Sequence, residues 1–304
     1  MHKEPVHFKA LGEKLAGTLV LPDAERPSPV LIVCHGAGEF KENYEELTEH
    51  LAGRGIASLA IDMHGHGESG GDRFCVDMAQ WVADIRAAID FLSCDGRVNG
   101  RQIGAFGLSS GGTAILEAGV VDLRLRFLVA LDATVRDSMP AAMSWMLKGM
   151  VCAGRVKRAL TGKTWRVPLA KLSVGPKMAA DPEINRRIMS NPRSLAAFME
   201  FPLPGAEQAF FVNTIERVGE IRAATLVLWG ENDELDPPET GRLLFQALRC
   251  KKQLHIIPGN GHVGHMDRNR AKVFELTAAW ILENVGPGSE TVGPTLPNPC
   301  AQTA

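Results

Sequence analysis

The first candidate for chemistry is a serine in a glycine-rich turn. The residues Gly107-Leu108-Ser109-Ser110-Gly111 follow the apolar run 103–106 and precede a run that is compatible with a helix. A serine on such a strand-to-helix turn has a strained backbone, and the flanking glycines let neighbouring segments approach it closely. The pattern predicts a nucleophile elbow with Ser109 as the nucleophile. The structural alternative is a turn in which Ser109 only caps the following helix.

A serine nucleophile also needs a base and an acid, because its hydroxyl reacts poorly until a neutral histidine, held by a carboxylate, takes the proton. Asp233 follows the apolar run 225–229, and His262 follows the apolar run 254–257. Open α/β sheets place their sites at the carboxyl ends of strands, so both residues are suitably placed. The sequence therefore predicts a triad of Ser109, Asp233 and His262.

Three other residues remain candidates for the base or the acid. His265 competes with His262, and Asp236 competes with Asp233, because each lies in the same loop as the residue it would replace. Asp132 follows the apolar run 127–131, so its carboxylate could also reach the base.

The oxyanion formed in such a reaction needs two donors, one from the residue after the nucleophile and one from the loop after the third strand. Ser110 would provide the first backbone N–H. The run Val33-Cys34-His35-Gly36-Ala37-Gly38-Glu39 would provide the second, because its glycines permit a sharp turn, and we expect Ala37 to be the donor. We expect His35 to organise the loop and Cys34 to pack in the core.

The stretch 62–69 contains residues that could be mistaken for metal ligands, namely Asp62, His64 and His66. A glycine-rich turn held by internal hydrogen bonds explains the stretch better. The sequence therefore predicts no metal and no cofactor.

The elements that would position these residues alternate along the chain. Apolar runs predict buried strands at 30–34, 56–61, 103–106, 127–131, 225–229 and 254–257. Helical patterns lie at 43–52, 76–92, 113–121, 238–248 and 271–284. This alternation predicts an α/β fold, with a mostly parallel sheet and helices on both faces. The segment 6–21 resembles an antiparallel hairpin at the sheet edge, with Gly12 near its turn.

The alternation stops between residues 134 and 220, where helix-like stretches rich in Met and Ala are interrupted by prolines. We interpret 134–220 as a helical cap inserted after strand 6, between core parts 1–133 and 221–285. The tail 286–304 is rich in Gly, Pro and small polar residues, which predicts disorder.

A methionine stripe lies within the predicted cap. Met139, Met143, Met146 and Met150 recur at spacings of four and three, as on one face of a helix. Methionine packs adaptably, so Met143, Trp145 and Met146 are candidate substrate-binding residues that would line an acyl pocket. Packing of the cap on the core is an equally consistent interpretation.

Three segments carry a resemblance to a known family. His35-Gly36-Ala37-Gly38-Glu39, Tyr44-Glu45-Glu46-Leu47 and the stretch 62–69 resemble the monoacylglycerol lipase and lysophospholipase branch of the α/β-hydrolases, the serine aminopeptidase S33 or hydrolase-4 group. The likeness extends over residues 6–132 and 225–285. The family's lipases usually carry His-Ser-Met where this chain has Leu108-Ser109-Ser110, and the segment 134–220 does not resemble any particular member that we can name.

The resemblance implies the α/β-hydrolase fold with an eight-stranded sheet, a triad of Ser109, Asp233 and His262, and Ala37 and Ser110 as oxyanion donors. The predicted activity is hydrolysis of a small carboxylic ester or thioester through an acyl-enzyme. The same machinery could serve acyl transfer, peptide or lactone opening, or release of a biosynthetic intermediate from a carrier thioester. A non-catalytic ligand-binding homologue fits less well, because every triad member is present.

Composition limits the partners and the location. The formal net charge is -2 with basic residues dispersed, which disfavours nucleic acid and anionic membranes as partners. The chain has neither a signal-peptide pattern nor a run near the roughly 18 apolar residues of a membrane span, so we expect a soluble cytoplasmic protein. Its six cysteines lack a Cys-x-x-Cys motif and are expected to be reduced. The oligomeric state is not determined by the sequence.

Overall fold

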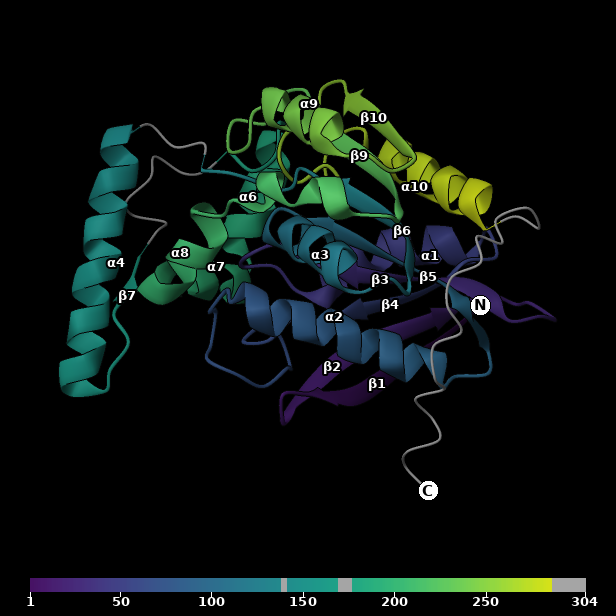
Figure 1. Cartoon of the computed structure of the whole chain (residues 1–304), viewed down its shortest axis with the longest axis horizontal. Helices are drawn as coiled ribbons and strands as arrows, with labels where there is room; N and C mark the ends of the chain where they lie inside the picture. The colour runs from purple at the N-terminus through teal and green to yellow at the C-terminus, as the bar shows by residue number, and fades with distance from the viewer. Residues whose placement is uncertain (138–140, 169–176, 286–304) are drawn as a thin grey trace.

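An eight-stranded sheet forms the centre of the computed structural model, which describes residues 1–137, 141–168 and 177–285 (Figure 1). The strands are β1 (His2–Ala10), β2 (Glu13–Leu21), β3 (Ser28–Cys34), β4 (Ala57–Ile61), β5 (Val98–Leu108), β6 (Leu125–Leu131), β9 (Ala224–Gly230) and β10 (Lys252–Ile257). Their order in the sheet is β1-β2-β4-β3-β5-β6-β9-β10. The pairs from β4 to β10 are parallel, so the prediction of a mostly parallel sheet is confirmed.

The predicted hairpin lies at the edge of this sheet. β1 pairs with β2, and β2 pairs with β4, both in antiparallel register. The hairpin loop consists of Leu11 and Gly12, which have φ values of 51° and 86°. Two consecutive positive φ angles belong to the turn whose twist matches that of the flanking strands.

Helices cover both faces of the sheet (Figure 1). One face packs against α2 (Met78–Ser93), α3 (Ser110–Val121) and α9 (Pro238–Ala247), and the other against α1 (Glu45–Ala52) and α10 (Arg270–Asn284). In β3, Val30, Ile32 and Cys34 point into the first layer, and Leu31 and Val33 into the second. Because both faces are buried, these strands are continuously apolar, and the runs were recognisable in the sequence.

The segment between β6 and β9 contains mainly helices. They are α4 (Ala141–Thr161), α6 (Pro182–Ser190), α7 (Pro192–Met199) and α8 (Leu203–Phe210), with the 3-10 helices η2 (Thr214–Glu216) and η3 (Val218–Glu220). β7 (Arg166–Val167) and β8 (Phe201–Pro202) form a small antiparallel pair that the sequence did not indicate. Several prolines begin helices rather than interrupt them, since proline fits the first helical turn.

Some expectations need correction or fall outside the described part of the chain. α3 begins at Ser110 rather than at 113, because its glycine-rich first turn resembles a loop in sequence. Cys94 is disulfide-bonded, so the expectation of reduced cysteines is wrong there, whereas Cys34, Cys75, Cys152 and Cys250 are free. The tail 286–304 and Met139 lie outside the described residues. Within the described ranges, no helix combines the length and apolar character needed to cross a bilayer.

Candidate active site

Ser109 lies in a tight turn between β5 and α3, and its backbone is strained. Its φ and ψ are 51° and -120°, a combination that residues other than glycine rarely adopt. A Cβ at Gly107 would lie 2.2 Å from the carbonyl oxygen of Gly111, so only glycine lets the turn close this tightly. The Ser109 side chain makes no capping hydrogen bond to α3. The half-buried serine therefore has elbow geometry rather than a capping role.

The loop after β3 lies beside this elbow. A Cβ at Gly36 would be 3.4 Å from the Cβ of Ser109, so the two segments approach each other closely. Ala37 follows Gly36 and is half-buried, and Ser110 is the first residue of α3. The two predicted oxyanion donors therefore belong to the two segments that meet at Ser109.

Substituting Gly111 with alanine is expected to destabilise the protein by about 1–3 kcal/mol, the usual cost of overpacking. The new Cβ would lie 2.4 Å from the carbonyl oxygen of His35 and 2.6 Å from that of Cys34, and neither backbone can move freely. Urea unfolding measures the change. Gly96→Ala is the control, because no atom lies within 4 Å of a Cβ there; equal stability of the two variants would contradict the close contact.

Asp233 and His262 form a buried hydrogen-bonded pair at the ends of β9 and β10. The Nδ1 atom of His262 lies 2.9 Å from Oδ2 of Asp233. The other carboxylate oxygen accepts the backbone N–H groups of Leu235 and Asp236 at 2.9 and 3.0 Å. Burial disfavours the charged imidazolium, but the charge of Asp233 and its hydrogen bond outweigh burial and raise the pKa of His262 above 6.5.

The loop that carries His262 reaches the end of β6, where the Ser109 turn also lies. The amide of Ser109 donates to the carbonyl oxygen of Leu131 at the end of β6, over 3.1 Å. A Cβ at Gly264 would lie 3.2 Å from Cδ1 of the same Leu131. Both loops therefore lie next to the end of β6. Ser109 and His262 thus lie on the side of the sheet where the parallel strands end.

This arrangement agrees with a family match. Residues 25–269 match the family model described as serine aminopeptidase, S33. The chain belongs to this family of α/β-hydrolases. The match spans both parts of the core and also the segment 134–220, where the sequence alone had indicated no likeness to the family. This chain therefore has the α/β-hydrolase fold and is a serine hydrolase of the lipase or esterase type.

Named relatives agree with this assignment. Monoglyceride lipase from Homo sapiens is 26% identical to this chain over 273 residues, which cover 84% of this chain and 83% of the lipase. A thiohydrolase from Eupenicillium brefeldianum is 25% identical over 276 residues, covering 86% and 87% of the two chains. The structure of the α/β-hydrolase GrgF from Penicillium sp. sh18 superposes with a TM-score of 0.78 at 21% identity, covering 92% of this chain and 98% of GrgF.

Asp132, the first alternative acid, is fully buried near the Asp233–His262 pair. Its Oδ1 atom accepts the backbone N–H of Gly230 at 2.7 Å. Its Oδ2 atom has no hydrogen-bond partner within the described residues and faces Gly264, where a Cβ would lie 3.4 Å away. Burial and the charge of Asp233 raise the pKa of Asp132 well above its ordinary value. Asp132 therefore takes up a proton more readily than an exposed aspartate does.

Asp236, the second alternative acid, helps to hold Asp233 in place. Its amide donates to Asp233, and its Oδ2 atom accepts the hydroxyl of Thr134 at 2.8 Å. Its carbonyl oxygen accepts the indole N–H of Trp229 at 2.7 Å. These contacts hold the acid loop against the ends of β6 and β9.

His265, the alternative base, is buried in a different cluster. Its ring stacks on Tyr44 with centroids 4.3 Å apart, and its Nε2 atom lies 3.5 Å from Oε1 of Glu39. The hydroxyl of Tyr44 donates to the other oxygen of Glu39 at 2.5 Å, and the amide of Gly36 donates to it at 3.3 Å. Burial lowers the pKa of His265, so its neutral ring packs behind the loop that carries Ala37.

The stretch 62–69 forms a hydrogen-bonded turn, as expected. His64 pairs with Asp84 of α2, and Nδ1 of His66 lies 3.0 Å from the carbonyl oxygen of His64. His35 connects this turn to the Ala37 loop, because its Nε2 accepts the amide of Met63 at 3.0 Å. Its ring therefore has a structural role, since burial lowers its pKa as well.

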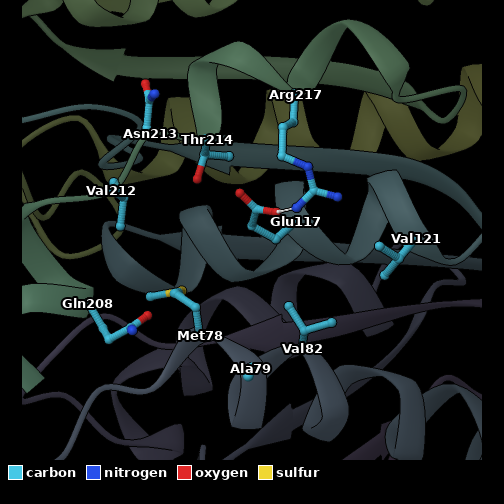
Figure 2. A pocket seen from close by; sticks show the side chains of 10 residues that line it. All are labelled: Met78, Ala79, Val82, Glu117, Val121, Gln208, Val212, Asn213, Thr214 and Arg217. Carbon is cyan, nitrogen blue, oxygen red and sulfur yellow. Dashed lines mark hydrogen bonds and ion pairs between the residues drawn. The ribbon is translucent and has the colours of Figure 1, made fainter.

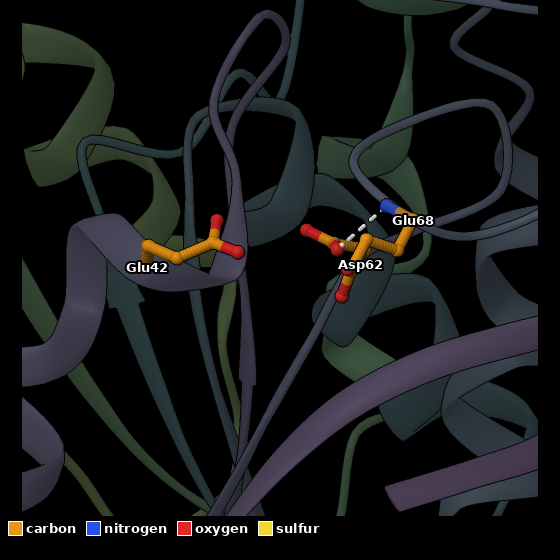
Figure 3. A group of neighbouring side chains, drawn as sticks. All are labelled: Glu42, Asp62 and Glu68. Atoms are coloured by element: carbon orange, nitrogen blue, oxygen red, sulfur yellow. Dashed lines mark hydrogen bonds between the residues drawn. The ribbon is translucent and has the colours of Figure 1, made fainter. Parts of the chain in front are cut away.

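Three carboxylates, those of Glu42, Asp62 and Glu68, converge beside the same turn, close enough together to hold a cation (Figure 3). The ammonium of Lys41 already lies between them, 3.0 Å from Glu42, 2.7 Å from Asp62 and 2.7 Å from Glu68. Burial disfavours the charged ammonium, but these hydrogen bonds raise the pKa of Lys41. A resident positive charge thus fills the space that a metal would need.

Chelation with EDTA is therefore expected to leave both the esterase rate and the Tm unchanged. The side chains that would bind a cation are neutralised by Lys41, and the triad candidates need no Lewis acid. Rates and melting curves with and without EDTA test this expectation. Loss of activity that added Ca²⁺ or Mg²⁺ restores would contradict it.

The candidate substrate residues of α4 are exposed in the described structure. Met143, Trp145 and Met146 are 52%, 78% and 60% exposed, and they lie at the surface. Leu147 and Met150 of the same helix pack on the core instead. This geometry therefore does not support the interpretation that these residues line an acyl pocket. Packing on the core explains Met150 but not the exposed Met143 and Met146.

A pocket of about 390 Å³ opens between α2, α3, α8 and η2 (Figure 2). Its wall includes Met78, Val82 and Val212, and the ion pair of Glu117 with Arg217 crosses it. Its lining contains none of the triad or oxyanion candidates. We therefore do not assign it to the reacting part of a substrate.

Several supporting residues were not predicted from the sequence. Lys41, Glu39 and Tyr44 hold the Ala37 loop, and Asp84 holds the stretch 62–69. Asp84 had a recognisable signal, since it is a charged residue on the buried face of a helix. The sequence carried no such signal for Lys41, because an isolated lysine in a loop is usually exposed.

Proposed function

We propose that this chain hydrolyses carboxylic esters and thioesters through an acyl-enzyme on Ser109. The hydroxyl oxygen of Ser109 attacks the carbonyl carbon while His262 takes its proton, and Asp233 stabilises the imidazolium. The bond to the leaving oxygen or sulfur breaks as His262 returns the proton to it. Water then attacks the acyl-enzyme with His262 as base, releasing the acid and restoring Ser109.

One observation carries this proposal: the strained Ser109 turn donates its amide to Leu131, and the loop that carries the hydrogen-bonded His262 approaches the same Leu131 at Gly264. Strained, non-glycine backbone is kept where function needs it. The N–H groups of Ala37 and Ser110 would bind the oxyanion, since their segments meet at Ser109.

We further propose that the segment 134–220 acts as a cap and selects the substrate through residues near Ser109. A Cβ at Gly38 would lie 3.2 Å from the ring of Phe198 in α7, so this ring covers the loop that carries Ala37. The amide of Val263 donates to the carbonyl oxygen of Met178 at 3.0 Å, which ties the cap to the histidine loop. Phe198 and Met178 thus replace the α4 residues as candidates for contact with the acyl chain.

A panel of p-nitrophenyl esters and acyl thioesters of increasing chain length is expected to reveal turnover of both leaving-group types. Thioesters are included because the relative from Eupenicillium brefeldianum is named a thiohydrolase. Phe198→Ala is expected to move the preferred chain length toward longer acyl groups, because it removes a ring beside the site. Trp145→Ala is the matched aromatic control and should leave the profile unchanged. Absence of turnover across the panel, or equal effects of both variants, would contradict the proposal.

A further inference from the structure

Asp267 is a fully buried carboxylate in the loop between β10 and α10. Its Oδ2 atom accepts the backbone N–H groups of Gly261 and Ala180, each at 2.7 Å. Its Oδ1 atom accepts those of Arg268 and Asp181 at 2.9 and 3.2 Å. A carboxylate offers about four acceptor positions, so these bonds use its whole capacity. Such bonds replace the water that a charged group loses on burial.

The donors to Asp267 belong to two distant parts of the chain. Gly261 directly precedes the candidate base, His262. Ala180 and Asp181 belong to the proposed cap. A Cβ at Gly261 would lie only 2.8 Å from the amide nitrogen of Ala180, so the two backbones are close neighbours. One carboxylate therefore joins the cap to the loop that carries the base.

The residue after His262 is bonded to the cap as well. The amide of Val263 donates to the carbonyl oxygen of Met178 at 3.0 Å. His262 thus stands between two residues, Gly261 and Val263, that are each connected to the cap segment 178–181. The position of the imidazole therefore depends on the docking of this segment.

Capping of α10 does not account for the bonds of Asp267. α10 begins at Arg270, and its N-cap residue, Asn269, makes no capping bond through its side chain. Arg268 is the donor nearest to α10, and it precedes the helix. The carboxylate therefore serves the junction of the cap with the histidine loop rather than the end of a helix.

The core holds the same loop through different bonds. Nδ1 of His262 is bonded to Asp233, and the carbonyl oxygen of Asn260 accepts the amide of Asn232 at 2.8 Å. Neither bond involves Asp267 or the cap. Loss of the Asp267 carboxylate would therefore leave the imidazole bonded to Asp233 but remove a restraint on the loop, so the direction of Nε2 would vary.

We propose that Asp267 is a positioning residue that couples the cap to the catalytic base, so that the docked segment 178–181 holds His262 in place for proton transfer. This inference rests on the proposed roles of His262 and of the cap. A displacement of about 1 Å at a reacting group can cost on the order of 100-fold in rate, so a residue away from the reacting atoms can have a large effect.

Asp267→Asn is expected to lower kcat for a p-nitrophenyl ester by about 10- to 100-fold, with a much smaller change in KM. The carboxamide has the size of the carboxylate, but its NH₂ group cannot accept the N–H groups that it faces. The pH limb of kcat/KM should stay near its wild-type position, because the bond of His262 to Asp233 remains. Fluorophosphonate labelling should be slower but still complete, whereas a merely structural role would lower the labelled fraction.

Asp122→Asn is the matched control. Asp122 is 6% exposed, accepts the backbone N–H of Arg124 at 3.1 Å, and follows α3 at the end away from Ser109. Its replacement should lower the Tm, because a buried acceptor is altered, but should leave kcat unchanged. An equal loss of kcat in Asp122→Asn and Asp267→Asn would overturn the inference, since the loss would then follow from destabilisation alone.

Gly261→Ala disturbs the same junction while keeping the carboxylate of Asp267. Its Cβ would push the loop away from the cap at Ala180, so kcat should fall as in Asp267→Asn. Circular dichroism checks that the variants are folded, and Gly261→Ala decides the question if Asp267→Asn does not fold.

Hydrogen exchange tests the coupling separately from activity. In Asp267→Asn, peptides containing residues 178–181 and 259–264 should both exchange faster than in the wild type, because each segment loses a bonded N–H. Both should stay protected in Asp122→Asn. Faster exchange in only one of the two segments would overturn the coupling.

The kinetic outcomes separate this inference from the proposed function. An active wild type, labelled at Ser109, with unchanged kcat in a folded Asp267→Asn would overturn the inference alone. A wild type that neither turns over esters nor is labelled at Ser109 would overturn the proposed function, and the positioning role with it.

Discussion

Ser109→Ala is expected to lower kcat/KM for an activated ester by about 10⁴- to 10⁶-fold, the range seen when the nucleophile of a triad is removed. The hydroxyl oxygen is the only atom lost. The strained turn, the contact of Gly36 and the hydrogen bond to Leu131 involve backbone or Cβ atoms and remain in the variant. Unfolding in urea should therefore be nearly unchanged.

Labelling by a fluorophosphonate measures the same property directly. The wild type should be labelled at Ser109, and the alanine variant should not be labelled. Ser110→Ala is the control, because the backbone N–H that would bind the oxyanion is retained and only a buried hydroxyl is removed. Full labelling of Ser109→Ala, or loss of labelling only in Ser110→Ala, would show that the nucleophile is another residue.

Asp233→Asn is expected to lower kcat by about 10³- to 10⁴-fold, because the amide favours the wrong tautomer of His262 and no longer stabilises its charge. Asp132→Asn is expected to cost less than about tenfold. Asp132 accepts the Gly230 N–H, whereas the hydrogen bond of His262 goes to Asp233, and burial and the charge of Asp233 favour the neutral form of Asp132 by raising its pKa. Asparagine keeps an acceptor for the Gly230 N–H. A larger loss in Asp132→Asn than in Asp233→Asn would identify Asp132 as the acid.

The pH dependence of kcat/KM provides a second measurement on the same variants. His262 acts as a base only when neutral, so a raised pKa means that kcat/KM rises with pH along a limb centred above 6.5. In Asp233→Asn the opposing carboxylate charge is gone and burial dominates, so this limb should move to lower pH. Asp132→Asn should move the limb less than Asp233→Asn does, because the charge of Asp132 contributes less to the raised pKa of His262 than the charge of Asp233 and its hydrogen bond. A limb that moves only in Asp132→Asn would contradict this assignment of charges.

Much of the fold was determined by local sequence patterns. The strands β3, β4, β6 and β9 are buried on both faces, so each contains a short apolar run that can be recognised without knowing the neighbouring strands. The turn at Ser109 was recognisable for a similar reason, because its strain and close contacts require glycines at fixed spacing within five residues. Family membership followed from comparable short segments around residues 35–47 and 62–69.

Only the tertiary structure decided which groups meet. Asp132, Asp233 and Asp236 all follow strands, but the sheet order and loop paths bring only Asp233 to the Nδ1 atom of His262. α4 is apolar on two opposite faces, so its periodicity alone could not determine which face packs inward. Strand and turn patterns are local and need few residues, whereas the partner of a carboxylate and the buried face of a helix depend on segments distant in the chain.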